Sequence, residues 1–525
     1  MFEVDSLQSF ATVIDDLIQN DDGSSQLPVI NKVSRQQDLP LSFAQERLWF
    51  LHQMDPDTAN YNIPSAVRIK GDIDSKALVQ ALCSLVERHE TLRTTFKEIK
   101  GEMVQIIHEN KDMDCCQLPI EDIAELSGLS DQTYGSNKDA DSVLQQLIKH
   151  EASQPFDLEN GPLFRVRLIE MSDNNHLLLS TMHHIISDGW SSGILVNEVA
   201  RFYQIYKQNE SIDIAPLSIQ YADYSSWQRH WFQGDYRQQQ LDWWKNKLTG
   251  SLELLNLPTD RPRPNMQTFA GDLVEFNIED ALATELTVLC RNQDVTLFML
   301  LLTVFKILLH RYSHQEIINV GSPIAGRNHA ELEEIIGCFV NTLVLSTDLS
   351  DNPSFTDCLK RVKETALGAF SHQEVPFEQL VELMQPDRNM SHSPLFQVAF
   401  TLQTAQQQKL DMGDLEFTQL SETNKTSKFD LTLTFIDSVN GLKGVFEYNT
   451  DLFDRSTIVR MTEHCQNIIN VIVKMPSEGI QTINLLGDKE RDQLLNQWNI
   501  TERDIDYDRH VPQIIEALAK KVPNL

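Results

Sequence analysis

The sequence predicts a mixed α/β protein with more than one hydrophobic core. Its 525 residues are too many for one compact core, because domains of about 150 residues are common. Three or four units fit this length, as do two large lobes with short flanks. Hydrophobic residues make up 41% of the chain, which is enough for ordinary cores. Segments with alternating and with helical hydrophobic spacing are interspersed, which predicts both strands and helices.

Acidic residues outnumber basic ones, and this limits the partners we expect. The chain has 76 Asp and Glu against 44 Lys and Arg, a net charge of −32. Such a charge repels nucleic acids and anionic membranes, so we expect neither as a partner. The seven cysteines show no CxxC spacing and indicate reduced thiols. The N-terminus does not resemble a signal peptide, which predicts a cytoplasmic protein.

The chain divides into four expected segments. Leu7, Phe10 and Ile14 recur at helical spacing before a polar break, which predicts one short helix followed by a linker. A proline cluster at 258–264 looks like a crossover or linker entering a second lobe. The expected segments are an N-terminal helix and linker (1–37), an N-terminal lobe (38–215), a C-terminal lobe (216–486) and a charged linker (487–525).

Within the first lobe, the spacing predicts a helix that begins after Asp74, an acceptable N-cap, and ends near Glu90. A strand is expected at 92–96. Alternation predicts a second strand at 164–168, and the mostly apolar run 176–182 predicts a third. The pattern becomes helical from Ser191, so the residues between 183 and 190 occupy a turn from strand to helix.

The most apolar run of the second lobe, 297–309, is interrupted by Lys306. It is shorter than the ~20 residues that a bilayer span requires. We therefore expect a buried helix there. The last apolar helix, around Ile514 and Leu518, stops abruptly, as if a neighbouring domain followed.

The stretch from His183 to Ser191 (HHIISDGWS) carries the most chemical information. Side chains alternate across a strand, so one of two adjacent histidines at a strand end enters a cleft while the other packs. Asp188 falls in the following turn. Gly189 allows a positive φ or a close backbone approach. These features suit a site that holds a reacting carbonyl beside an imidazole.

A structural interpretation competes with this one. Two adjacent histidines are more often buried structural residues, and Asp188 is then a helix cap. The complete HHxxxDG string favours the functional interpretation, since composition alone produces it in roughly one chain in a thousand of this length. A zinc site is not indicated, because adjacent histidines do not easily face one ion and no His or Cys ligand set accompanies them.

Seven motifs are spread along the chain. They lie at residues 42–51 (SFAQERLWFL), 88–96 (RHETLRTTF), 183–191 (HHIISDGWS), 221–228 (YADYSSWQ), 336–343 (IGCFVNTL), 372–377 (HQEVPF) and 388–397, which ends in SPLFQ. With these motifs in this order, the chain resembles a condensation domain of a nonribosomal peptide synthetase.

The resemblance implies a V-shaped pair of lobes, each similar to chloramphenicol acetyltransferase, with the HHxxxDG residues in a tunnel between them. Upstream donor and downstream acceptor carrier domains then deliver thioesters on phosphopantetheine arms, and an adenylation domain is adjacent. The reaction that it implies is attack of the acceptor α-amine on the donor thioester carbonyl, which forms a peptide bond. No metal or diffusible cofactor is expected on this chain.

The resemblance also implies residue roles. His184 is expected to be the catalytic histidine, with His183 beside it in the packing. Asp188 is expected to pair with Arg93 and fix the turn, although Arg93 also fits a solvated strand position. The Gly189 N–H is a candidate oxyanion donor. Residues expected to contact substrate are Trp190, Ser191 and Asn341.

The subtype is inferred by exclusion. Epimerisation relatives carry HHxxxDxxSW, whereas Ser192 stands at the Trp position here. Cyclisation relatives carry DxxxxD, whereas the first position here is His183. The motifs resemble the class that joins an L-donor to an L-acceptor. Two other functions stay open: starter-type N-acylation or ester formation, and a non-catalytic recruitment module, in which the HHxxxDG string is usually degraded. Residues 2–18 resemble the last helix of a carrier domain or a docking helix.

Overall fold

The computed structural model describes most of the chain, including all of the motif residues from 183 to 191. The expected helix within residues 1–27 and the start of the last motif, 388–390, lie outside the described residues. The described residues are 28–109, 120–122, 140–172, 174–210, 215–385, 391–404, 415–420, 426–438, 441–501 and 510–522.

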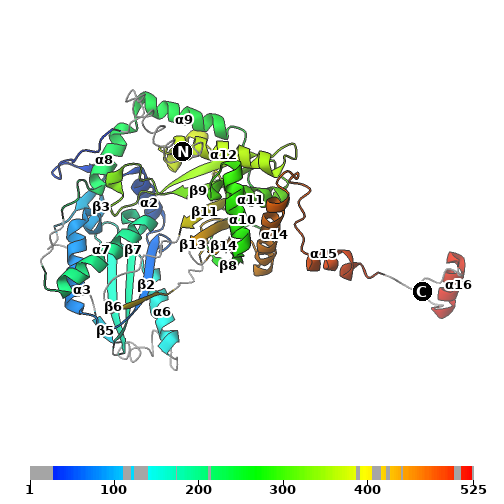
Figure 1. Ribbon diagram of the computed structural model, residues 1–525, viewed down its shortest axis with the longest axis horizontal. Helices are drawn as coiled ribbons and strands as arrows, with labels where there is room; N and C mark the ends of the chain where they lie inside the picture. Colours follow the sequence, from blue (N-terminus) through cyan, green and yellow to red (C-terminus); the bar gives the residue numbers. More distant parts are fainter. Residues whose placement is uncertain are drawn as a thin grey trace.

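Two large sheets, one in each lobe, organise the molecule (Figure 1). The N-terminal lobe holds a five-stranded sheet in the order β12-β2-β7-β6-β5. Its central strands pair antiparallel, so the side chains of each strand alternate between its two faces. The strands are β2 (Asn62–Lys70), β5 (Ile120–Asp122), β6 (Phe164–Ser172), β7 (Asn175–His183) and β12 (Glu416–Gln419).

Two long helices, α3 (Ser75–Arg88) and α7 (Gly189–Lys207), pack against each other over this sheet. Asp74 caps α3 by accepting hydrogen bonds from the N–H groups of Lys76 and Ala77, which confirms the predicted helix start. A third helix, α6 (Ala140–Ser153), contacts β2 and β7 through a separate small apolar cluster.

A small three-stranded sheet, β1-β4-β3, completes the N-terminal lobe. The predicted strand at 92–96 begins two residues late, because residues 90–93 form a short 3-10 turn, η1 (Glu90–Arg93). The remaining elements of this lobe are β1 (Leu39–Pro40), α2 (Phe43–Met54), β3 (Thr94–Ile99) and β4 (Glu102–Ile107).

The C-terminal lobe holds a six-stranded mixed sheet in the order β10-β9-β11-β13-β14-β8. Its strands are β8 (Gly271–Ile278), β9 (Ile317–Ile324), β10 (Asn341–Asp348), β11 (Val398–Thr404), β13 (Leu431–Ser438) and β14 (Gly441–Asn449). Its helices are α10 (Asp280–Gln293), α11 (Leu297–Ser313), α12 (Phe355–Ser371), α13 (Phe377–Met384) and α14 (Arg455–Lys474).

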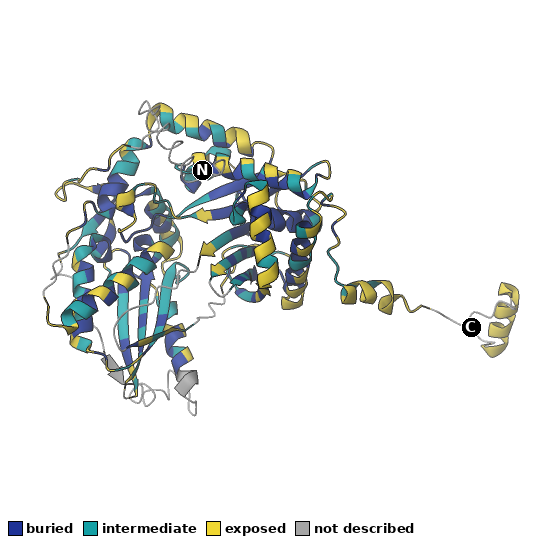
Figure 2. Cartoon of the chain, in the orientation of Figure 1, coloured by how far each residue is buried: buried dark blue, intermediate teal, exposed yellow. Residues whose placement is uncertain are grey.

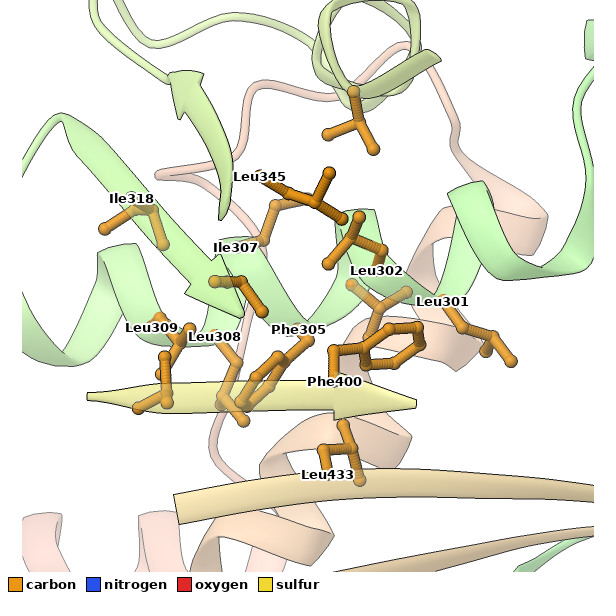
Figure 3. Close-up of a cluster of buried hydrophobic side chains, with 14 of the residues drawn as sticks. Leu301, Leu302, Phe305, Ile307, Leu308, Leu309, Ile318, Leu345, Phe400 and Leu433 are labelled. Carbon is orange, nitrogen blue, oxygen red and sulfur yellow. The ribbon is translucent and has the colours of Figure 1, made fainter. Parts of the chain in front are cut away.

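Helix α11 is the centre of the larger core. Figure 3 shows its side chains, among them Leu302 and Phe305, packed against Ile318, Phe400 and Leu433 of the sheet. The prediction of a buried helix at 297–309 is therefore confirmed. Lys306 is fully buried within it, and its Nζ donates to the carbonyl oxygens of Ile318 (2.8 Å) and Leu345 (2.6 Å).

One strand does not follow the expected division at residues 215 and 216. Strand β12 lies between β11 and β13 in sequence, and both of these belong to the C-terminal sheet. Yet β12 pairs antiparallel with β2, in register from Glu416 opposite Lys70 to Gln419 opposite Val67. The chain therefore crosses to the N-terminal lobe and returns.

The lobes are also joined by α8 (Tyr221–Trp231) and α9 (Gly234–Leu248), which lie along the top in Figure 1. Beyond the C-terminal lobe, α15 (Asp488–Leu495) and α16 (Val511–Lys521) extend away from it and are exposed (Figure 2). Helix α16 presents Val511, Ile515 and Leu518 to solvent.

Among the described residues, no single helix has the length and apolarity to cross a membrane. One bent pair, Asp280–Asn292 with Leu297–Ser313, meets those criteria only when its two helices are taken together.

The burial of Lys306 generates a prediction about stability. Burial lowers the pKa of Lys306 well below its usual value, so between that pKa and about 10.4 the unfolded chain binds one more proton than the folded chain. Stability contributed by this residue therefore rises with pH. We expect the melting temperature of the unaltered protein, measured relative to that of Lys306→Met, to rise between pH 7 and pH 9.

The matched control is Lys443→Met, which removes a partly exposed lysine of β14 that pairs with Glu275. Its melting temperature relative to the unaltered protein should change little over the same pH range. An equal pH dependence for the two variants would contradict a deprotonated Lys306 in the folded state.

Candidate active site

The HHxxxDG residues form the turn between β7 and α7, as predicted. Strand β7 ends at His183, a short 3-10 turn η4 (His184–Ile186) follows, and α7 begins at Gly189 with Asp188 as its N-cap. His183 is the last strand residue and His184 the first residue of η4. Their side chains therefore have different environments.

His183 is buried, with only 3% of its surface exposed. Its Nδ1 accepts a hydrogen bond from the N–H of Ile185 (3.1 Å), and the rings of Phe156 and Tyr61 lie 6.0 and 6.5 Å away. Burial lowers the pKa of His183 to about 3, with smaller effects of His184 and His52. His183 is therefore a neutral packing residue that holds the turn.

His184 is partly exposed although protein surrounds it. Its backbone N–H donates to the Tyr61 carbonyl (2.8 Å), and its Nδ1 lies 3.7 Å from the Cys338 Sγ. Burial and the positive charge of Lys428 lower the pKa of His184 to about 4. The imidazole is neutral at pH 7, so one ring nitrogen is free of a proton.

Lys428 brings this positive charge to the site from the segment before β13. Its Nζ lies 5.4 Å from the centre of the ring of Tyr61, the residue whose carbonyl accepts from the His184 backbone N–H. The Lys428 side chain is exposed, yet burial among protein atoms and the charge of Arg47 lower its pKa.

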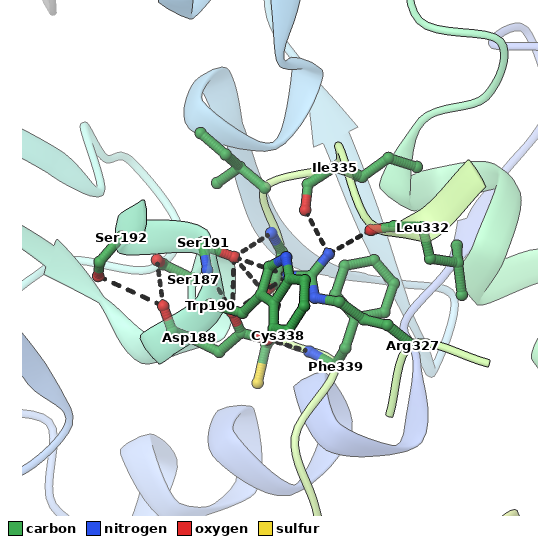
Figure 4. Close-up of polar contacts among 12 residues, drawn as sticks. Ser187, Asp188, Trp190, Ser191, Ser192, Arg327, Leu332, Ile335, Cys338 and Phe339 are labelled. Atoms are coloured by element: carbon green, nitrogen blue, oxygen red, sulfur yellow. Dashed lines mark hydrogen bonds and ion pairs between the residues drawn. The ribbon is translucent and has the colours of Figure 1, made fainter. Parts of the chain in front are cut away.

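Asp188 is fully buried and accepts several hydrogen bonds (Figure 4). Its Oδ1 accepts from the N–H (2.8 Å) and the hydroxyl (2.7 Å) of Ser191, and its Oδ2 from the N–H of Phe339 (3.1 Å). The Arg327 guanidinium lies 3.1 Å from Oδ1. Asp188 therefore caps the helix and connects the two lobes.

Arg327 is held from several sides. It follows β9 in the C-terminal lobe, and its Nη1 donates to the carbonyl oxygens of Leu332 and Ile335. Its guanidinium lies over the Phe339 ring, 4.1 Å from the centroid. The side chains of Arg327 and Asp188 are 2% and 1% exposed, so the pair is fully buried and its geometry is fixed by these hydrogen bonds.

The expected ion pair between Arg93 and Asp188 is wrong. Arg93 ends η1 and donates through Nη1 to the His108 carbonyl (2.6 Å), beside β4. The Asp188 carboxylate turns the other way, toward the C-terminal lobe, because Phe339 and Arg327 approach it from there. The structural role predicted for Asp188 holds, but its partner is Arg327.

Gly189 is the first residue of α7 and is exposed. It does not have the positive φ that a glycine allows. A Cβ built on it would meet no atom within 4 Å. The first N–H groups of a helix have no partner inside the helix, and the helix dipole adds positive charge there. The predicted role of the Gly189 N–H as an oxyanion donor stays a prediction.

The three expected substrate contacts have different outcomes. Ser191 is fully buried, and its hydroxyl also accepts from the N–H of Gly337 (3.0 Å), so a direct substrate contact by Ser191 is wrong. Asn341 donates to the carbonyls of Gln373 and Val375 and accepts from the N–H of Phe377. Trp190 is 50% exposed and donates to the Glu333 carbonyl. Substrate contact by Trp190 or Asn341 stays a prediction.

Sequence reasoning missed Arg327 and the contact of Cys338 with His184. Cys338 lies within the quoted motif at 336–343, but its side chain was given no role. Arg327 lies 139 residues after Asp188, outside every quoted motif. A signal for this region was present in Gly326, the residue before Arg327. Gly326 has a φ of +64°, and a Cβ on it would lie 2.1 Å from the Phe339 carbonyl oxygen. Such a glycine marks a close backbone approach.

The arrangement brings together a neutral imidazole, the N-terminus of a long helix and a nearby cation. These groups suit a reaction in which a carbonyl oxygen becomes negative while a nucleophile loses a proton. Within the described ranges, no group of three or more His, Cys, Asp or Glu side chains is placed to hold a metal ion.

Comparison with known proteins identifies the family. The family model described as Condensation domain matches residues 35–495. This chain therefore belongs to the condensation domain family, with its two lobes and its HHxxxDG turn.

Similar chains are parts of much longer proteins. A linear gramicidin synthase protein of Brevibacillus parabrevis is 42% identical over the whole of this chain, which spans only 7% of that protein.

The X-domain in its complex with OxyB from teicoplanin biosynthesis has a TM-score of 0.77 and 25% identity over 89% of this chain and all of its own. A four-domain nonribosomal peptide synthetase bound to AMP and glycine has a TM-score of 0.78 and 23% identity over 96% of this chain and 37% of its own, which shows a shared fold.

The buried pair generates a prediction about stability. Arg327→Met leaves the Asp188 carboxylate buried without its counter-charge, which typically costs about 3–5 kcal/mol. We expect Arg93→Met to cost much less, since the partner it loses is one carbonyl oxygen. Chemical unfolding of both variants checks this. A loss for Arg93→Met equal to that for Arg327→Met would contradict the assignment.

The electrostatics of His184 generate a second prediction. With a pKa of about 4, the ring should stay neutral down to pH 5, whereas an unperturbed histidine titrates near 6.5. NMR of histidine-labelled protein between pH 5 and 8 measures this, with His184→Ala to assign the signal. A midpoint near 6.5 for that signal would contradict the described environment.

Proposed function

We propose that this chain catalyses peptide bond formation between two carrier-bound substrates. The donor is an aminoacyl or peptidyl thioester on an upstream carrier domain, and the acceptor is the α-amine of an aminoacyl thioester on a downstream carrier domain. The observation that carries the proposal is the neutral, partly exposed His184 imidazole beside the N-terminus of α7.

The reaction needs modest proton chemistry. An α-amine has a pKa near 8, so a useful fraction is already unprotonated at pH 7. The amine nitrogen attacks the thioester carbonyl, a C–N bond forms and the C–S bond breaks. The unprotonated nitrogen of His184 orients the amine and accepts its proton after attack. That proton then goes to the departing thiolate of the donor arm.

The negative oxygen of the intermediate needs a hydrogen-bond donor. The Gly189 N–H is suited to this, because it lies at the positive end of α7 and the space beside it is open. Lys428 adds positive charge on the same side of the site as Tyr61. Asp188 does no proton transfer, because its charge is already balanced by Arg327.

We further propose the L-donor and L-acceptor subtype, since Ser192 stands where epimerisation relatives carry Trp. The phosphopantetheine arms belong to the carrier domains and enter as parts of the substrates. An adjacent adenylation domain and a cytoplasmic location complete the proposal. They fit a chain whose relatives are long synthetases, and the net charge of −32 argues against nucleic acid and anionic membranes.

A recruitment module is the second candidate, and a specific observation favours it. The X-domain whose structure resembles this chain is in a complex with OxyB. The intact HHxxxDG turn and the neutral His184 argue for catalysis instead. Starter-type N-acylation or ester formation would use the same groups with a different donor or acceptor.

The test is reconstitution with carrier domains loaded with a panel of aminoacyl-pantetheine thioesters, followed by mass analysis of the acceptor carrier. We expect a dipeptide on the acceptor carrier. Loss of the base in His184→Ala should lower the rate by roughly a hundredfold or more without unfolding the protein. His150→Ala, an exposed histidine of α6, is the matched control.

His183 should respond in the opposite way. Because His183 is buried and accepts a hydrogen bond from Ile185, His183→Ala should lower the melting temperature more than it slows the reaction. No dipeptide from any loaded pair would favour the recruitment module, and an ester or fatty acyl product would favour the other acyl transfers. Near-native product from His184→Ala would contradict the role of His184.

A further inference from the structure

Residues 28–35, which we call the N-terminal strap, bind along the junction of the two lobes. The Trp227 indole N–H donates to the Pro28 carbonyl (2.8 Å). Asp223 accepts from the Val33 N–H (2.8 Å) and from both terminal nitrogens of Arg35 (2.6 and 3.0 Å). Arg35 also pairs with Glu90 of the N-terminal lobe. The strap is therefore anchored at both ends.

The middle of the strap is anchored by Ile30. This side chain is 8% exposed, whereas the adjacent Val29 is 73% exposed. Ile30 belongs to an apolar cluster with Tyr221, Tyr224, Leu332, Ile335 and Phe339. Two of these residues, Leu332 and Ile335, supply the carbonyl oxygens that hold Arg327. The strap thus packs on the residues that orient the partner of Asp188.

A second connection runs through the start of α8. Asp223, to which the strap binds, directly follows the buried residues Tyr221 and Ala222 at the beginning of that helix. The Tyr221 hydroxyl donates to the Cys338 carbonyl (2.6 Å) and lies 2.7 Å from the Ser42 hydroxyl. Its ring packs against Phe339, with centroids 4.8 Å apart. A Cβ on Gly337 would lie 2.0 Å from the Tyr221 ring, so the fit is close.

The segment that Tyr221 holds, residues 337–339, touches the active site with each of its three residues. The Gly337 N–H donates to the Ser191 hydroxyl (3.0 Å). The Cys338 Sγ lies 3.7 Å from Nδ1 of His184. The Phe339 N–H donates to Asp188 (3.1 Å). A shift of this segment would displace the catalytic imidazole and the helix cap together.

We propose that the N-terminal strap and Tyr221 are positioning elements for the reaction, which hold residues 337–339 against His184 and Asp188. The inference rests on the proposed function, since it concerns the rate of that reaction. A docked strap keeps the imidazole oriented for the amine, and a released strap lets the segment move. Misplacing a reacting group by about 1 Å is enough to slow a reaction a hundredfold.

The experiment compares neighbouring residues of the strap in the full chain. Ile30→Ala removes the buried anchor, and Val29→Ala removes a similar volume from the exposed neighbour. We expect kcat of Ile30→Ala to fall about tenfold at a temperature well below its melting point, with KM for both loaded carriers unchanged. Val29→Ala should behave as the unaltered protein does.

Arg35→Gln tests the polar anchor, with Arg261→Gln as its control, because Arg261 pairs with Asp454, the N-cap of α14 in the C-terminal lobe. We expect kcat to fall for Arg35→Gln and to recover in part for Arg35→Lys. Should these variants fail to fold, Tyr221→Phe keeps the ring and removes only the hydroxyl. The control is Tyr206→Phe in α7, whose hydroxyl lies 2.7 Å from that of Ser84. Tyr221→Phe should lower kcat without changing KM.

Several results would overturn the proposal. An unchanged kcat with a lowered melting temperature would make the strap a purely structural element. A raised KM for the donor carrier with an unchanged kcat would make it a docking surface for that carrier. Failure of the proposed function is distinguishable, because the unaltered protein would then form no dipeptide at all.

Discussion

The buried ion pair of Asp188 and Arg327 is the interaction on which the arrangement of the site depends. Asp188 belongs to the turn that carries His184, and Arg327 follows a strand of the other lobe. Two charges removed from water are tolerated only when each is paired and hydrogen-bonded. Here Ser191, Phe339, Leu332 and Ile335 supply those bonds. The requirement to satisfy these charges fixes the two lobes relative to each other at the position where the chemistry takes place.

Because of this pairing, two polar residues that follow β7, His184 and Asp188, differ in their electrostatic state. Asp188 is neutralised by Arg327, whereas His184 has no ion-pair partner among the described residues. Enclosure by protein and the charge of Lys428 keep its imidazole unprotonated. The buried His183 is neutral as well, but its ring is fixed in the packing. His183 and His184 thus have different environments, because strand β7 ends at His183 and the 3-10 turn η4 begins at His184.

Local patterns predicted much of this structure. The cap at Asp74, the strand before the motif and the buried helix at 297–309 all depend on residues close in sequence. The cap at Asp188 belonged to the competing structural interpretation. The partner of Asp188 was not predictable in this way, because Arg327 reaches it through tertiary folding across 139 positions. Arg93 was the wrong choice because sequence motifs carry no information on which way a carboxylate faces. The exclusion of Ser191 from substrate contact likewise required knowing that the network buries its hydroxyl.

Strand β12 has a consequence for how the two lobes can move relative to each other. It pairs with β2 of the N-terminal lobe while the strands before and after it, β11 and β13, belong to the other sheet. Separating the lobes would therefore break a backbone ladder as well as side-chain contacts, and each broken bond would leave polar groups to be solvated. Motions of one lobe against the other that keep the ladder from Glu416 to Gln419 intact therefore cost less free energy than motions that break it.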